Sequence, residues 1–360
     1  MSNKEGKAMV FEKPQQPFVL QKMTMPRIKE TEAIVEISHT TICSSDLHTY
    51  NGRRSSPSPC VLGHEIMGNI VELASEGVKD FSGQELKIGD RVTWSIYAHD
   101  HNDEMALKGI PQKSASLFKY GHQKLSASST LSGGFATHCH LRAGTDIFKV
   151  PTHLQLKEAA PLNCTHATVA GAIRLAGSLK DKNVLVMGVG MLGLSACAMS
   201  KEAGARKLWA MDVNQDRLTK APDFGSDGEI NASTPLGEIE SILAKQGGVD
   251  VVIETSGTPS AMENGIQLLN IGGVCIWVGA VYTQRDLAIN AEKIVRNILT
   301  IKGLHNYAPK DLATAIDFLS RNNHKYPFID LVDREFPLAQ LDQAFEVASK
   351  GADYRVGVHP

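Results

Sequence analysis

The stretch Gly188-Val189-Gly190-Met191-Leu192-Gly193 decides the fold of this chain. It follows an apolar run, Val184 to Met187, and opens a segment of helical pattern that extends to Glu202. In such a GxGxxG turn the first glycine permits a tight turn, the second lets a pyrophosphate approach the backbone, and the third lets helix and strand pack closely. The N-terminus of the helix favours negative charge. Gly188, Gly190, Met191, Leu192 and Gly193 are therefore predicted to bind a dinucleotide.

An acidic residue follows at the spacing that a dinucleotide-binding unit requires. Asp212 ends the next apolar run, Lys207 to Met211, 19 residues after Gly193. A carboxylate there accepts hydrogen bonds from the adenosine ribose hydroxyls and repels a 2′-phosphate, so NAD is preferred over NADP. Arg217 is also predicted to bind the cofactor. A GxGxxG turn can also be a simple packing turn, but here strand, helix and acidic residue are all in place.

On either side of this turn, the chain shows two different patterns of predicted secondary structure. From Ile34 to about Pro151, short β-rich runs alternate with Gly, Pro and Ser turns, which predicts mostly antiparallel β-structure. From about Lys182, strand and helix patterns alternate, with further strands expected at Val249 to Ile253 and Ile298 to Lys302. That alternation predicts a parallel sheet, and 360 residues are enough for two domains.

Composition narrows the class of protein. The chain is 42% hydrophobic and 21% charged, with a net charge of -2. This balance is typical of a folded protein and argues against disorder or binding to nucleic acid. No stretch predicts an export signal or a membrane span, so we expect a soluble cytoplasmic protein. Six scattered cysteines in a reducing compartment indicate free thiols or metal ligands, not a disulfide framework.

Two short segments carry metal-binding chemistry. Cys43-Ser44-Ser45-Asp46-Leu47-His48 places a thiol, a hydroxyl, a carboxylate and an imidazole within six residues, and Gly63-His64-Glu65 follows. Catalytic zinc takes three protein ligands of Cys and His type and leaves one position open. Each residue alone has a plain alternative as a buried packing or hydrogen-bonding side chain. The two segments leave the third ligand open.

These segments resemble the zinc-containing medium-chain alcohol dehydrogenases, which carry a Cys-x-Ser-Asp-x-His run and a Gly-His-Glu run. The resemblance covers essentially the whole chain and implies that the third ligand is Cys164, in Pro161-Leu162-Asn163-Cys164-Thr165. It implies one catalytic zinc held by Cys43, His64 and Cys164. The remaining cysteines match no motif and are assigned to packing: Cys60, Cys139, Cys197 and Cys275.

The same resemblance assigns roles around the metal. Zinc lowers the pKa of the alcohol, and hydride leaves for nicotinamide. Ser45 would accept the hydroxyl proton and pass it through the nicotinamide ribose to His48. Asp46 would orient His64, and Glu65 would lie behind the metal and assist ligand exchange. Thr168 would pack near the nicotinamide.

A second, structural zinc is not expected. The family places four cysteines after Gly89-Asp90-Arg91-Val92, but that spacing here falls on Asp100, Asp103, Ala106 and Ser114. The loop from 99 to 104 is read as a solvated polar segment, with a replacement metal site built from His99, His101 and nearby carboxylates as the alternative. The prediction is one zinc per chain.

Within the family the chain resembles the subgroup described as phosphonate-catabolism-associated alcohol dehydrogenases. The matching segments are Tyr50-Asn51-Gly52-Arg53-Arg54, Thr93-Trp94-Ser95, Gly109-Ile110-Pro111-Gln112-Lys113 and Leu117-Phe118-Lys119-Tyr120-Gly121-His122. Arg53 and Arg54 fall where family members usually line the substrate cleft with apolar residues. Two guanidiniums there could bind an alcohol that carries an anionic group such as a phosphonate. The alternative is that both arginines are solvated charges on the surface.

The expected fold is α/β: a GroES-like, β-rich catalytic domain formed by residues 1–165 and 305–360, plus a Rossmann NAD-binding domain at 166–304. Arg355 resembles a family arginine that reaches the NAD pyrophosphate, with a surface ion pair as the alternative. A homodimer or homotetramer is expected, with the strand Gly273 to Val278 placed where family members pair their sheets.

Two other functions remain open from the sequence. A zinc-free quinone or enoyl reductase has the same fold, but the retained Cys43, His64 and Cys164 argue against it. A non-catalytic NAD-binding protein is favoured only by the missing structural lobe.

Overall fold

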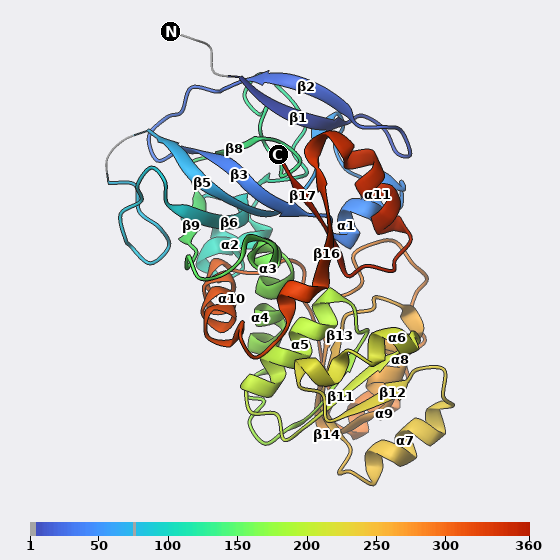
Figure 1. The fold of residues 1–360 in the computed structure, drawn as a ribbon. Coiled ribbons are helices and arrows are strands. Elements are labelled where there is room, and N and C mark those ends of the chain that lie inside the picture. The colour runs from blue at the N-terminus through green and yellow to red at the C-terminus, as the bar shows by residue number, and fades with distance from the viewer. Residues whose placement is uncertain (1–4, 75–76) are drawn as a thin grey trace. The chain divides into compact units, whose positions relative to one another are not determined.

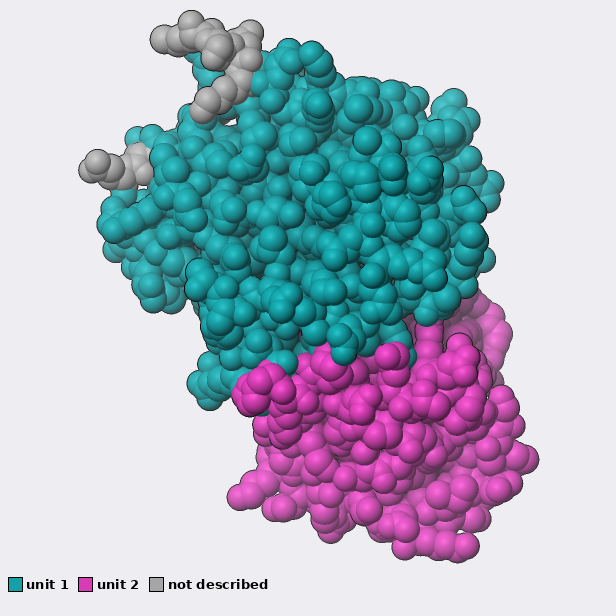
Figure 2. Space-filling view, viewed as in Figure 1, with its two compact units in different colours: residues 1–164, 307–323, 328–360 teal, residues 165–306, 324–327 magenta. Residues whose placement is uncertain are grey.

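The computed structural model describes residues 5–74 and 77–360. The chain divides into two compact units, coloured separately in Figure 2. Unit 1 comprises residues 1–164, 307–323 and 328–360, and unit 2 comprises residues 165–306 and 324–327. Residues from both ends of the chain therefore build unit 1. The short return of 324–327 to unit 2 is not expected from the sequence.

Unit 2 is built on a six-stranded parallel sheet (Figure 1). In spatial order its strands are β12 (Gly228–Asn231), β11 (Lys207–Asp212), β10 (Asn183–Met187), β13 (Val249–Glu254), β14 (Leu269–Trp277) and β15 (Thr300–Gly303). Every residue of β10 is buried, as expected for a central parallel strand covered on both faces. The strand order reverses beside β10, which is the topological switch point where such sheets bind dinucleotides.

Helices connect these strands. They are α4 (Thr165–Ala176), α5 (Met191–Glu202), α6 (Gln215–Leu218), α7 (Leu236–Ala244), α8 (Pro259–Gln267) and α9 (Ala291–Arg296). Nine of the twelve residues of α5 are buried, so this helix is enclosed on nearly all sides. His166 Nδ1 and Ser195 Oγ lie 2.9 Å apart and join α4 to α5. The predicted strand–helix alternation is confirmed.

Unit 1 is β-rich. Its larger sheet has the order β16 (Val332–Pro337), β17 (Arg355–His359), β3 (Ala33–Thr41), β5 (Glu65–Leu73), β6 (Arg91–Ala98) and β7 (Phe118–Lys119), with β8 (His138–Leu141) on β3 and β9 (Thr145–Lys149) on β6. A smaller sheet has the order β2 (Val19–Thr24), β1 (Glu5–Phe11) and β4 (Cys60–Val61). The helices are α1 (Ser44–Tyr50), α2 (Glu104–Leu107), α3 (Leu156–Ala159), α10 (Pro309–Asn322) and α11 (Leu341–Ser349).

An aromatic cluster fixes α1 in unit 1. The ring of Phe345, on α11, lies 5.2 Å from that of Tyr50 at the end of α1 and 4.7 Å from that of Phe18. Phe18 and Tyr50 stack at 5.5 Å. Aromatic pairs in this range add attraction beyond the area they bury. The C-terminal segment thus packs on the helix that begins at Cys43.

One expectation about subunit pairing is wrong. The segment Gly273 to Val278 lies largely within β14, which pairs with β13 on one side and β15 on the other. A strand with two neighbours has already used its backbone donors and acceptors, so it cannot pair with a second chain. The last strand on this side of the sheet is β15.

Among residues 5–74 and 77–360, no helix combines the length and the apolar character needed to cross a membrane.

His39 is an unusual buried group in β3. It is 3% exposed, its Nδ1 lies 3.6 Å from a Glu335 carboxylate oxygen, and its Nε2 has no hydrogen-bond partner among the described residues. Burial lowers the pKa of His39 from 6.5 to about 4, with Glu335 opposing and His359 and Lys157 adding to the shift. The folded protein therefore resists protonation at this position.

This burial predicts an acid-sensitive contribution to stability. Because the folded-state pKa lies below the unfolded one, the unfolded chain binds the extra proton, so stability is complete above about pH 6.5 and is lost as the pH falls towards 4. The loss attributable to His39 is on the order of 3 kcal/mol. In urea unfolding at several pH values, His39→Gln should show a shallower decline than the wild type between pH 6.5 and 4. Parallel declines would contradict this assignment.

Candidate metal and cofactor sites

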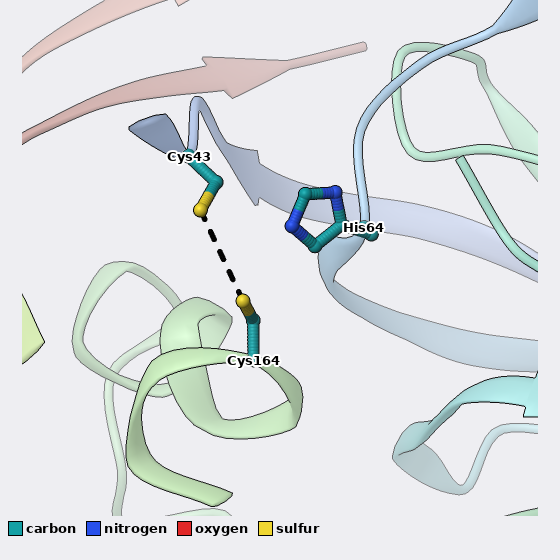
Figure 3. Close-up of side chains that lie close together, drawn as sticks. All are labelled: Cys43, His64 and Cys164. Carbon is teal, nitrogen blue, oxygen red and sulfur yellow. Dashed lines mark hydrogen bonds between the residues drawn. The ribbon is translucent and has the colours of Figure 1, made fainter. Parts of the chain in front are cut away.

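Three side chains of unit 1 converge on one point. The sulfurs of Cys43 and Cys164 lie 3.9 Å apart, and one ligand atom from each of Cys43, His64 and Cys164 lies within 4.8 Å of the others. Figure 3 shows the two sulfurs pointing at each other and the His64 ring turned towards them. Two thiolates bound to one tetrahedral zinc, at about 2.3 Å each, would be separated by about 3.8 Å. The donor set and spacing fit zinc.

Local backbone geometry brings these ligands together. Cys43 follows β3 and is the N-cap of α1. His64 follows Gly63, whose φ of +87° is a conformation that side chains rarely adopt, and a Cβ there would lie 2.9 Å from the Phe135 nitrogen. Beside Cys164, Asn163 accepts a bond from the Ile66 N–H and donates to the Trp94 carbonyl. The Tyr307 hydroxyl donates to the Asn163 carbonyl.

Asp46 links two of the ligands. Its carboxylate is fully buried and accepts from the Cys43 N–H at 3.0 Å and from the Gly63 N–H at 3.3 Å. The same carboxylate lies 3.3 Å from His64 Nδ1. A carboxylate on Nδ1 turns the other ring nitrogen, Nε2, towards a metal. The expected orienting role of Asp46 therefore has a geometric basis.

Glu65 and Arg355 form a buried pair behind the ligands. Arg355 donates Nε to Glu65 Oε2 at 2.8 Å and Nη2 to Oε1 at 3.0 Å, while the Thr41 hydroxyl donates to Oε2 at 2.5 Å. Arg355 Nη2 also lies 3.8 Å from Cys43 Sγ. Its side chain is 3% exposed, so this is not the surface ion pair offered as an alternative by the sequence. The contact of Arg355 with a pyrophosphate stays a prediction.

The electrostatics favour a thiolate at the ligand set. A hydrogen bond from Cys164 lowers the pKa of the Cys43 thiol well below its usual value despite burial, and Arg355 and His64 lower it further. The pKa of the Cys164 thiol is raised by that same bond and by burial. Burial lowers the pKa of His64, but Asp46 and Cys43 outweigh it and raise the pKa overall. These directions favour a thiolate at Cys43, with Cys164 keeping its proton.

Ser45 and His48 lie on α1. Ser45 Oγ is 3.2 Å from His64 Nε2, so its hydroxyl lies beside the ligand set. His48 is three residues further along the same helix, hence on the same face. Burial, Arg53 and Arg54 lower the pKa of His48, whereas Cys43 raises it, and the net shift is downward. The lowered pKa favours the neutral form of His48, which can accept a proton.

The structure separates the two arginines. Arg53 is exposed, whereas Arg54 is half-buried and donates Nη1 to His122 Nε2 at 3.4 Å. The ring of His122 lies 5.4 Å from that of His64. Arg54, and not Arg53, thus reaches the neighbourhood of the ligand set.

His122 is a site residue that the sequence analysis missed. Its position depends on Gly121, where a Cβ would lie 2.7 Å from the Gly63 carbonyl oxygen, so the two Gly-His pairs pack backbone to backbone. Burial lowers the pKa of His122 well below its usual range, and His64 and Arg54 add to this. The repeated Gly-His dipeptide at 63–64 and 121–122 is the signal that could have found it.

The glycine turn of unit 2 has the expected geometry. Gly188 has φ of +89°, and a Cβ on Gly193 would lie 1.8 Å from the Gly188 carbonyl oxygen. At Gly190, the N-cap of α5, the nearest atom to an added Cβ is a guanidinium nitrogen of Arg217 at 3.8 Å. Gly193 therefore serves packing, whereas Gly190 leaves space in front of the helix N-terminus.

Asp212 and Arg217 flank this turn. The Asp212 carboxylate accepts from the N–H groups of Val189 at 2.6 Å and Asn214 at 2.9 Å, which fixes it beside the glycines with lone pairs remaining. Arg217 lies on α6, with its guanidinium at Gly190. Thr168 is on α4, the helix bonded to α5, and its contact with nicotinamide stays a prediction.

The four positions that correspond to the structural lobe do not come together as a metal site among the described residues. Asp103 caps α2 by accepting from the Met105 N–H, and Asp100 accepts from the Asn102 N–H. The four unassigned cysteines, at 60, 139, 197 and 275, are all fully buried in the two cores.

Comparison with known proteins agrees with this geometry. Residues 29–152 match the family of alcohol dehydrogenase GroES-like domains, and residues 191–321 match that of zinc-binding dehydrogenases. A sorbitol dehydrogenase of Halalkalibacterium halodurans is 30% identical over 95% of this chain and 96% of its own. An alcohol dehydrogenase of Geobacillus stearothermophilus is 29% identical over 96% of both chains. The structure of an alcohol dehydrogenase from Thermotoga maritima, 26% identical, covers 99% of this chain and 100% of its own, with a TM-score of 0.93.

The chain belongs to the zinc-binding medium-chain alcohol dehydrogenase family and is a dehydrogenase. The predicted combination of a GroES-like domain and a Rossmann domain is confirmed.

The two glycines should respond differently to substitution. Gly193→Ala places a methyl group against the Gly188 carbonyl, so unit 2 must distort, and the melting temperature should fall by several degrees. Gly190→Ala meets no such obstacle and should lower the melting temperature less than Gly193→Ala does, although alanine is a poorer N-cap than glycine. With the pyrophosphate bound at this turn as predicted, the added methyl group should weaken NADH binding at least about 10-fold. NADH titration by fluorescence and thermal unfolding test both, and wild-type NADH affinity in Gly190→Ala would refute the placement.

Proposed function

We propose that this protein is a zinc-dependent alcohol dehydrogenase that holds one catalytic zinc per chain with Cys43, His64 and Cys164 and uses NAD. The observation that carries the proposal is the convergence of two sulfurs and one imidazole within 4.8 Å. The zinc-free reductase alternative gives no account of this donor set or of the carboxylate on His64 Nδ1. Two thiols and a histidine are the ligands of catalytic zinc in alcohol dehydrogenases.

The residues around the ligands supply positioning and proton transfer. Zinc bound here would polarise the alcohol oxygen and lower its pKa, while the nicotinamide accepts hydride. Ser45 Oγ, at the ligand set, accepts the hydroxyl proton, and His48 on the same face of α1 receives it on the way to solvent. Asp46 and the Glu65–Arg355 pair hold the ligands in place from behind.

Preference for NAD over NADP rests on Asp212. Its carboxylate is fixed by two backbone N–H groups at the glycine turn, where it would accept bonds from ribose hydroxyls and repel a 2′-phosphate. Arg217 lies nearby and suits the pyrophosphate.

The proposed substrate is an alcohol that carries an anionic group, such as a hydroxyalkyl phosphonate, in line with the subgroup resemblance. Arg54 supports it, because its guanidinium lies on His122, whose ring neighbours His64. A half-buried guanidinium offers paired donors that match a phosphonate or carboxylate.

We propose that the chain forms a homodimer or homotetramer through the β15 side of the unit 2 sheet. Ile271, Val295 and Ile298 are each more than 70% exposed near this strand. Exposed apolar side chains beside an unpaired strand are typical of an interface between copies.

Loss of one sulfur ligand tests the metal site. Cys164→Ala should lose the catalytic zinc and lower kcat/KM for any active alcohol by at least about 1,000-fold, because one of the three ligands is removed. Cys197→Ala is the matched control, since that thiol is buried in unit 2 and should change neither quantity. Full zinc content and activity in Cys164→Ala would refute the ligand set.

Comparison of the two arginines tests the substrate class. Arg54→Ala should lower kcat/KM for hydroxyalkyl phosphonates by about 10- to 100-fold, with uncharged alcohols changed less than about 3-fold, because an ionic hydrogen bond contributes roughly 1.5–3 kcal/mol. Arg53→Ala, at an exposed position next to it, is the control and should have a smaller effect. Equal effects of Arg54→Ala on charged and uncharged alcohols would contradict an anionic substrate.

A further inference from the structure

A second cluster of ligand-type side chains lies in unit 1, where the end of β6 pairs with the start of β9. One ligand atom from each of His99, His101 and Asp146 lies within 4.8 Å of the others. The rings of His99 and His101 are 4.4 Å apart, and His99 Nδ1 is 3.8 Å from Asp146 Oδ2. These residues belong neither to the catalytic ligand set nor to the cofactor turn.

Two atoms of this cluster are buried and lack hydrogen bonds. His99 Nδ1 and Asp146 Oδ2 have no hydrogen-bond partner among the described residues, although their side chains are 3% and 10% exposed. Burying a polar atom without a hydrogen-bond partner is unfavourable, because its contact with water is lost and not replaced. The separation of 3.8 Å is too long for a direct hydrogen bond, whereas two atoms bound to one tetrahedral ion at about 2.1 Å each would lie about 3.4 Å apart, so a shift of a few tenths of an ångström lets both bind one ion.

A simple ion pair does not account for the arrangement. His99 Nδ1 and Asp146 Oδ2 are 3.8 Å apart, which is beyond hydrogen-bond distance, and the ring of His101 stands 4.4 Å from that of His99. A divalent cation held by the two imidazoles and the carboxylate would give both buried atoms a partner.

The backbone around the cluster is rigid and open on one side. The His99 N–H donates to the Gly144 carbonyl at 3.1 Å, and Ala98 pairs with Thr145 across the strands. A Cβ on Gly144 would lie 2.2 Å from the His99 carbonyl oxygen, so the two strand ends are in close contact. His101 is exposed and lines a cavity of about 490 Å³, which gives an ion and its water ligands access.

Charges around the cavity are compatible with a cation. Asp100 lines it directly, and Asp100 and Asp103 both act on His99 as negative charges. The positive group on the lining is Arg142, which is paired with Glu32 at 3.4 Å.

We propose that His99, His101 and Asp146 bind one divalent transition-metal ion, Zn²⁺ being the probe, with water in the remaining position. Two imidazoles and one carboxylate form a donor set suited to zinc and neighbouring first-row ions and contain no thiolate. The ion joins the segment after β6 to the start of β9, which gives it a structural role. The total becomes two ions per chain, which revises the single zinc and the purely solvated loop expected from the sequence.

Metal stoichiometry of the full-length protein tests this proposal. After equilibration with Zn²⁺ and removal of loosely bound metal, elemental analysis should give two zinc ions per chain in the wild type and one in His101→Asn, which alters an exposed residue. Asp146→Asn should behave like His101→Asn. Asp100→Asn, a neighbouring acidic residue outside the ligand set, should retain two. One zinc in the wild type, or two in both ligand variants, would overturn the proposal.

Cobalt distinguishes this site from the catalytic one. In Co²⁺-loaded protein, thiolate-to-metal charge-transfer absorption should persist in His101→Asn and disappear in Cys164→Ala, which keeps one ion. The affinity of the second ion should fall at least about 100-fold in His101→Asn, since even an indirect partner of a metal ligand contributes 10- to 100-fold. Loss of the thiolate band in His101→Asn would place that histidine at the catalytic metal and refute a separate site.

Discussion

The carboxylate of Asp46 makes the contacts on which the proposed metal site depends. It accepts hydrogen bonds from the backbone on both sides of the site, at Cys43 and at Gly63, and it faces the ring of His64. Cys43 and His64 lie on separate segments, and this one group sets the position of both. A fully buried carboxylate is stable only when donors surround it, so the site and the local fold require each other.

The Glu65–Arg355 pair adds a second constraint, from the opposite end of the chain. Its partners are 290 residues apart in sequence, and their two hydrogen bonds form beside the strand pairing of β17 with β3. Removing one member of a buried ion pair leaves an uncompensated charge, which destabilises the fold more than replacing both members by well-packed apolar residues. The pair therefore makes the geometry behind Cys43 difficult to alter one residue at a time.

The sequence predicted those parts of the molecule that are local in the chain. The local features are the glycine turn, its flanking strand and helix, and Asp212. The fold class followed from them and from the two patterns of predicted secondary structure. Cys43 and His64 were found from local motifs, whereas Cys164 depended on family resemblance, because nothing around it marks a ligand. Family resemblance also predicted that Arg355 contacts the cofactor, whereas in the structure its guanidinium donates hydrogen bonds to Glu65.

Contacts between distant segments could not be read in this way. His122 reaches His64 only because two glycine backbones pack together, and Asp146 reaches His99 only because β9 begins beside the end of β6. The position of β14 between two other strands could not be predicted from its sequence, because strand order in a parallel sheet depends on crossover connections and not on the strand's own residues. Periodicity indicates that a strand exists, but it does not name its neighbours.

Unit 1 is built from both ends of the chain, with most of unit 2 between them, and this affects the order in which its parts are synthesised. All three proposed ligands of the catalytic zinc have been synthesised by residue 164, and the long segment of unit 2, residues 165–306, follows before β17 is made. Until that last strand is made, β3 lacks one of its pairing partners and Glu65 lacks Arg355. Most of unit 2 can fold while the chain is still growing, whereas the surroundings of the proposed zinc ligands are complete only after the C-terminal strand has been added.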